Sequence, residues 1–87
     1  MLLHFTKNVH FTRLVRTADR LREFNFRRFA HADEYLFHVD VADDRGNRII
    51  FRMRKQDANW YITETTVPNW IQVLEKTLSS LIVEEGS

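Results

Sequence analysis

The chain has 87 residues, of which 44% are hydrophobic and 29% charged, and a formal net charge of +1. These proportions are typical of one small globular domain, residues 1–87, and argue against a disordered or membrane protein. A domain of this size buries its surface incompletely, so we expect self-association to stabilise it. The absence of cysteine excludes a disulfide framework and a thiolate metal site within the chain.

Basic and acidic residues are unevenly distributed along the chain. Residues 1–32 contain seven Lys or Arg and two acids, whereas residues 33–87 contain six and ten. This division predicts an anion-binding face, attraction between two copies, or pairing of the basic half with the chain's own acidic half. The first residues lack the features of a signal peptide, and no apolar run approaches the ~20 residues that cross a bilayer. We therefore expect a cytoplasmic protein that does not bind membranes.

The N-terminal third fits two structures. Residues 10–17 are rich in β-branched and aromatic side chains, and residues 17–20 can form a turn to a second strand over residues 21–29, which favours a β-hairpin. A helix over residues 8–23, capped by Asn8 or Thr6, remains the alternative. The apolar residues at helical spacing that support it are Phe11, Leu14, Val15, Ala18 and Leu21.

The next two segments alternate apolar and polar residues on either side of a turn. A three-residue loop of Asp44, Arg45 and Gly46 places glycine where a positive φ is needed and sets Asp43 opposite Asn47. Counting outward then predicts the strand register. One face pairs Val41 with Ile49, Val39 with Phe51 and Phe37 with Met53, and the other pairs Asp40 with Ile50, His38 with Arg52 and Leu36 with Arg54.

A second reversal over residues 56–59 leads to a third strand of this meander. We expect Asn59 to adopt the left-handed conformation there, and a four-residue loop sets Lys55 opposite Trp60 and Met53 opposite Ile62. Arg54 then faces Tyr61, so that its guanidinium could lie over the ring.

Pro68 favours the start of a helix that Gly86 could cap. Its apolar stripe is Val67, Trp70, Ile71, Leu74, Leu78, Leu81 and Ile82, and its polar side is Asn69, Gln72, Glu75, Lys76, Ser79 and Ser80. The sequence therefore predicts an α+β fold in which an antiparallel meander of four to five strands packs on one C-terminal helix.

No residue pattern points to catalysis, a cofactor or a metal. His38 and Asp40 share a strand face, but a metal site needs a third ligand, and an ion-paired polar surface is the simpler interpretation. Asp43 and Asp44 lack the spacing of a calcium loop and suit a turn. We expect a protein that is not an enzyme and has no cofactor.

The geometry of a single helix on a sheet predicts a binding surface. One helix cannot cover both faces of the sheet, so the second face must meet water or a partner. We expect a small binding module that forms a homodimer, sheet to sheet or edge to edge, with another protein as a further possible partner. The residues expected on this face are Leu36, His38, Ile50, Arg52, Arg54 and Tyr61.

Two other functions fit parts of the sequence. A single-stranded nucleic-acid binder would use basic and aromatic residues of the N-terminal half, namely Arg22, Phe24, Phe26, Arg27 and Arg28. A small-molecule pocket could lie between helix and sheet near Trp60 and Trp70. We rank both below the homodimer.

Overall fold

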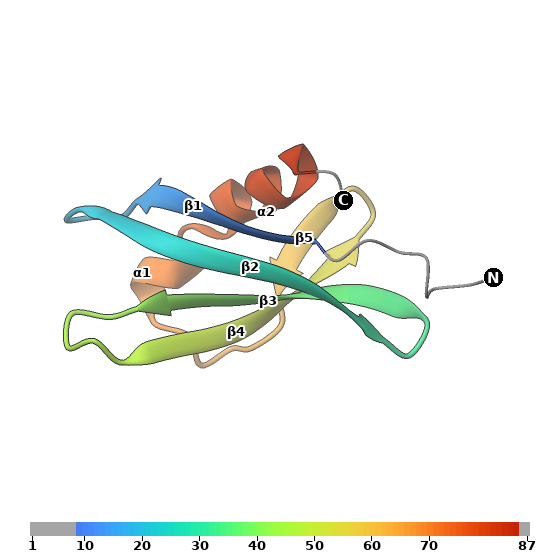
Figure 1. Cartoon of the computed structure of the whole chain (residues 1–87), viewed down its shortest axis with the longest axis horizontal. Helices are drawn as coiled ribbons and strands as arrows, with labels where there is room; N and C mark the ends of the chain where they lie inside the picture. Colours follow the sequence, from blue (N-terminus) through green and yellow to red (C-terminus); the bar gives the residue numbers. More distant parts are fainter. Residues whose placement is uncertain (1–8, 86–87) are drawn as a thin grey trace.

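The computed structural model describes residues 9–85 as one antiparallel sheet with two helices on one side (Figure 1). Its five strands follow one another in chain order, as a meander. This confirms the predicted α+β class. The elements are β1 (His10–Arg16), β2 (Leu21–His31), β3 (Glu34–Ala42), β4 (Arg48–Gln56), β5 (Asn59–Ile62), α1 (Asn69–Gln72) and α2 (Glu75–Glu84).

The N-terminal third forms the predicted hairpin, and the alternative of a helix over residues 8–23 is wrong. β1 pairs with β2 along its whole length, from His10 opposite Arg27 to Arg16 opposite Leu21. The Thr17 N–H closes the turn by donating a 2.9 Å hydrogen bond to the carbonyl oxygen of Arg20. The β-branched and aromatic residues of β1 favour a strand, and pairing with the long β2 stabilises that strand. The caps considered for the helix, Thr6 and Asn8, lie outside the described residues.

The β3–β4 hairpin has the register that the sequence predicts, with all six predicted pairs present. Gly46 has a φ of +82°. The N–H of Asp43 donates to the carbonyl oxygen of Asn47 at 2.8 Å, and the Asp43 carboxylate accepts hydrogen bonds from the N–H groups of Arg45 and Asn47. Hydrogen bonds within the turn therefore bind its backbone N–H groups and hold the two strands in one register.

The β4–β5 turn has the predicted register but a different conformation. Lys55 lies opposite Trp60, and Gln56 pairs with Asn59, so the loop has two residues rather than four. Asp57, and not Asn59, takes the left-handed conformation, with a φ of 59°. Aspartate tolerates this region because its short polar side chain can bond to nearby backbone.

The C-terminal segment forms two helices instead of the predicted single one. The chain turns between α1 and α2 at residues 73–74, where the Leu74 N–H donates to the Ile71 carbonyl oxygen at 2.9 Å. Val73, a β-branched residue of lower helix propensity, lies at this break with its side chain exposed. Neither described helix combines the length and hydrophobicity of a membrane-spanning segment. The predicted cap, Gly86, lies outside the described residues.

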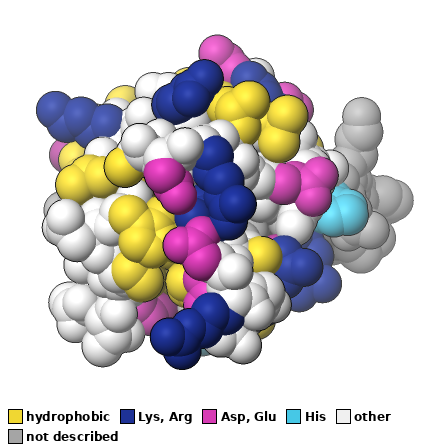
Figure 2. Space-filling view, turned by 90° about the vertical axis from the view of Figure 1, so that its left-hand side faces the viewer, with side chains coloured by type: hydrophobic (Ala, Val, Ile, Leu, Met, Phe, Trp, Pro, Cys, Tyr) yellow, Lys and Arg dark blue, Asp and Glu magenta, His cyan; other side chains and the backbone are white. Residues whose placement is uncertain are grey.

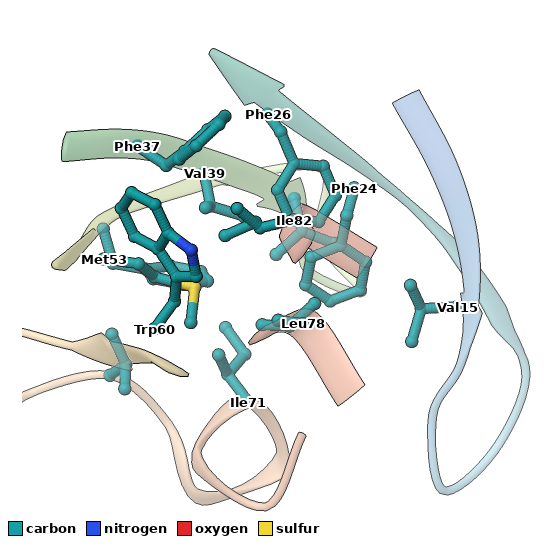
Figure 3. Packing of buried hydrophobic residues seen from close by; sticks show 13 residues of the cluster. Val15, Phe24, Phe26, Phe37, Val39, Met53, Trp60, Ile71, Leu78 and Ile82 are labelled. Atoms are coloured by element: carbon teal, nitrogen blue, oxygen red, sulfur yellow. The ribbon is translucent and has the colours of Figure 1, made fainter. Parts of the chain in front are cut away.

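The core lies between the helices and the sheet face that they cover (Figure 3). Every residue of the predicted apolar stripe packs in or against it. Phe11 stacks on Phe26 with ring centroids 4.6 Å apart, and the edge of one ring meets the other between Phe37 and Trp60 at 5.0 Å. Ser79, predicted on the polar side of the helix, is instead 5% exposed and lies against β5.

Candidate interaction surface

We call the sheet face turned away from α1 and α2 the outer face. Alternation along each strand places one set of side chains in the core and the other set here. No element of residues 9–85 covers this face in Figure 1, and two of its side chains, Leu14 and Ile50, are 65% and 62% exposed. The outer face is thus the surface that remains for contacts with other molecules.

The structure brings the six predicted binding residues together on this outer face. Leu36, Arg54 and Tyr61 form one row across β3, β4 and β5, and His38 lies opposite Arg52 in the next row. Tyr61 is 41% exposed. The prediction that Leu36 is available for contact is corrected, because this residue is only 3% exposed. It lies between Phe29 and Arg54 in the register, so large neighbours flank it on both sides.

The two predicted arginines of the outer face are paired within the chain. The Arg52 Nε donates to Glu64 Oε2 at 2.8 Å, and the same carboxylate accepts the Arg52 backbone N–H. The Arg54 Nε lies 3.2 Å from Glu34 Oε2, so its guanidinium is paired with a carboxylate although Tyr61 faces it in the register. Burial raises the pKa of Glu64, but the hydrogen bonds from Arg52 outweigh burial and lower it overall.

A polar chain crosses the outer face one row further along. The Thr12 hydroxyl donates to Asn25, and the Asn25 amide donates to the Asp40 carboxylate at 2.9 Å. Asp40 also accepts from Arg48 at 3.1 Å. His38 instead lies against the ring of Phe29, with centroids 4.5 Å apart. Asp40 and His38 therefore have separate partners, and no three His, Asp or Glu residues in the described part of the chain are grouped to hold a metal ion.

Two exposed leucines at the β1 end of the outer face were missed by the sequence reasoning. Leu14 is 65% and Leu21 51% exposed. Both had been placed in the apolar stripe of the alternative helix. Val15 faces the core, so strand alternation directs its neighbour Leu14 to the opposite face. This alternation was the signal that could have identified Leu14 as an outer-face residue.

Arg22 lies where the β1–β2 and β3–β4 turns approach each other. It donates to Asp44 at 2.5 Å, to Asp19 at 3.3 Å and to the Ala42 carbonyl oxygen at 3.2 Å. Its guanidinium also lies over the Trp70 ring, 4.8 Å from the centroid. The hydrogen bond from Arg22 lowers the pKa of Asp44 and in turn raises the pKa of Arg22. Figure 2, seen from the end with these turns, shows acidic and basic side chains interleaved.

Two further arginines of the basic half pair with acids of the acidic half. Arg20 lies 2.7 Å from Asp44. Arg13 lies 2.9 Å from Glu84 and 2.8 Å from Glu85, at the C-terminal end of α2, and the hydrogen bond to Glu84 raises the Arg13 pKa. Some arginines of the basic half therefore form ion pairs with acidic residues of the other half of the same molecule, between segments far apart in the chain.

The five residues proposed for nucleic-acid binding do not share a surface. Phe24 and Phe26 have no exposed area and lie in the core, so their rings are not available for stacking on bases. Arg22 is 9% exposed, and Arg28 lies over the Tyr35 ring at 4.5 Å on the helix side of the sheet. Arg27 alone among the five is an exposed side chain of the outer face.

Two hollows lie beside Trp60, which is itself 3% exposed. One, of about 380 Å³, is lined by side chains that include Arg28, Tyr35 and Lys55. The other, of about 370 Å³, is lined by residues of β5 and α2. The second hollow therefore lies between helix and sheet near Trp60, in part of the region where a pocket was predicted. Trp70 lines neither hollow and lies under Arg22. Comparisons with known protein families, with curated proteins and with solved structures found no match for this chain.

Proposed function

We propose that the protein is a small non-enzymatic interaction module that works as a homodimer, and that two copies join through the open side of the sheet, face to face or edge to edge. The observation that carries this proposal is an uncovered face with large exposed apolar side chains. Leu14, Leu21, Ile50 and Tyr61 are between 41% and 65% exposed. Apolar side chains grouped on one face typically mark contact sites.

The charges of the outer face favour a second copy over a strongly charged partner. Arg48, Arg52 and Arg54 each lie within 3.2 Å of a carboxylate of the same chain. A surface on which these three cations are already paired gives little attraction for a polyanion. It can still bury apolar area against an identical surface, and a domain of this size gains stability from such burial.

Nucleic-acid binding has less support. It needs exposed rings beside exposed cations, but Phe24 and Phe26 are in the core and Arg22 is tied to Asp44. Arg27 remains as an exposed cation. We therefore keep this function as the alternative and give its test below.

Sedimentation velocity at micromolar concentration tests the homodimer directly. The expected result is a species with the mass of two chains, which dissociates on dilution. A single species with the mass of one chain across the concentration range would overturn the proposal.

A further inference from the structure

The two edges of the sheet differ, and one of them is already occupied. β5 forms one edge, and its N–H groups on that side are bound by side chains of α2. The Trp60 N–H donates to Ser79 Oγ, and the Ile62 N–H donates to Glu75 Oε2, both at 2.8 Å. An edge whose donors are bound in this way cannot add another strand without losing these bonds.

The other edge, β1, has no partner strand among the described residues. The N–H of Arg28 donates to the Val9 carbonyl oxygen and the N–H of Thr17 to the Arg20 carbonyl oxygen, both at 2.9 Å. The odd-numbered residues of β1 therefore bond to β2. By strand alternation, Thr12, Leu14 and Arg16 direct their backbone N–H and C=O groups away from the sheet.

Several devices that normally protect an edge strand are missing from β1. Its seven residues contain neither proline nor glycine, and its pairing with β2 has no bulge. Arg13 is one of its two arginines, and its charge is paired with Glu84 and Glu85. Leu14 stands on this edge with 65% of its surface exposed.

We propose that two copies pair antiparallel along β1, around a two-fold axis at Leu14, so that two five-stranded sheets become one continuous sheet. This inference rests on the proposed homodimer and specifies how its copies join. Because the β5 edge is bound by α2, β1 is the only free sheet edge within residues 9–85, so β1 of one copy binds β1 of the other. Such a contact uses the same surface twice, and the assembly therefore closes at two chains.

Backbone parity limits the position of the axis, and the side chains favour one of the positions that it allows. The outward groups belong to even-numbered residues, so facing hydrogen-bonded residues must both be even. An axis at Arg13 would set Arg13 beside its own copy, and like charges placed directly opposite destabilise a sheet. An axis at Leu14 sets Leu14 against Leu14 of the other copy and Thr12 against Arg16. The exposed Leu21 of each copy is the diagonal neighbour of its own Leu14 and therefore lies beside this contact.

Single-cysteine variants test the arrangement, because the chain has no cysteine of its own. With the axis at Leu14, the two Cα atoms lie about 5.5 Å apart, a separation that a disulfide spans. We expect L14C to form a covalent dimer under mild oxidation on a non-reducing gel. I50C tests face-to-face pairing instead, because Ile50 lies on the same face with similar exposure, 62% against 65%. It should stay non-covalent if the copies join along β1.

A lysine substitution gives an independent measurement. Leu14→Lys places a charge on the pairing edge and should raise the dissociation constant of the dimer by about tenfold or more. Val73→Lys, the matched control between α1 and α2 with 69% of its surface exposed, should leave it unchanged. Both side chains are exposed, so circular dichroism should show native structure in both variants.

The outcomes separate this inference from the proposed function. A dimer that cross-links through L14C and is weakened by Leu14→Lys supports both. A dimer that cross-links through I50C, or that Leu14→Lys leaves intact, overturns the β1 pairing but leaves the homodimer standing. A protein that sediments as a single chain overturns both.

Discussion

The backbone N–H of Trp60 donates a 2.8 Å hydrogen bond to the Oγ of Ser79. This bond joins the last strand of the sheet to the middle of α2. Ser79 is 5% exposed, so the bond forms away from water, where an unmet donor is costly. A polar residue of the helix thus closes one edge of the sheet.

Replacing this serine should destabilise the protein. Ser79→Ala removes the acceptor of a buried N–H, and the expected loss in the free energy of unfolding is about 1 to 3 kcal/mol. Urea denaturation monitored by tryptophan fluorescence measures it. The control is Ser80→Ala, because Ser80 is exposed on the next position of the same helix. Equal stability of the two variants would contradict the structural role given to Ser79.

Truncation of a core leucine in α2 should have a larger effect. Leu78 has no exposed surface, so Leu78→Ala should lower the free energy of unfolding by about 2 to 5 kcal/mol through lost burial and the cavity it leaves. Val83, in the same helix, is 46% exposed. Val83→Ala should therefore change stability much less, and a Leu78→Ala variant as stable as Val83→Ala would show that this helix does not pack as described.

Two of the three described turns with a positive φ predict opposite responses. Gly46 has a φ of +82°, and no atom lies within 4 Å of the place a Cβ would occupy. Gly46→Ala should therefore cost about 1 to 2 kcal/mol from backbone strain alone. Ala32 already has a φ of 54°, so Ala32→Gly should leave stability unchanged or raise it. Thermal unfolding of both variants checks the sign of each change.

The pair of Asp44 with Arg22 predicts a loss of stability in acid. The hydrogen bond from Arg22 holds the pKa of Asp44 below its ordinary value. A carboxyl with a lowered folded pKa adds stability above its unfolded pKa of about 3.9, and this contribution is lost as the pH falls through the lower folded value. Asp44→Asn should therefore be less stable than the unchanged protein at pH 7, with the difference shrinking in acid.

Urea denaturation over a pH series measures this difference. Asp33→Asn is the control, since Asp33 is exposed and has no ion pair within residues 9–85. It should follow the unchanged protein at each pH. A constant difference between Asp44→Asn and the unchanged protein from neutral to acid pH would show that the Arg22 pair does not depend on the Asp44 charge.

The alternative function has a simple test. Fluorescence anisotropy of a labelled single-stranded oligonucleotide at low salt should stay flat as protein is added, because the rings suited to stacking are buried. A rise that weakens with salt, and that Arg27→Ala reduces, would favour nucleic-acid binding instead. Arg28→Ala is the control, since Arg28 lies over Tyr35 on the helix side of the sheet.

The β3–β4 hairpin shows how much could be predicted. Its register depends on a glycine with positive φ and on alternation, and both are local properties of the sequence. The β1–β2 hairpin was harder, because the same apolar residues fit a helical stripe and a strand. Pairing with β2, a contact between segments, decided between them.

The candidate surface was predicted in part. Strand parity placed Ile50, Arg52 and Tyr61 on the outer face, as the structure has them. Parity cannot reveal how far neighbouring side chains cover one another, so the burial of Leu36 was not foreseen. Leu14 was missed because residues 10–17 fitted both a strand and a helix. The face on which a residue lies depends on which of the two forms.

The sequence by itself determined the register of β3, β4 and β5, the turn at Gly46 and the apolar stripe that covers the sheet, because each depends on turn residues and on local alternation. Tertiary structure alone decided the break between α1 and α2, the burial of Ser79 against Trp60, and the pairing of Arg13 with Glu84 across the chain. It also decided which edge of the sheet is bound and which is open. These features depend on distances between segments, which no local pattern of residues encodes.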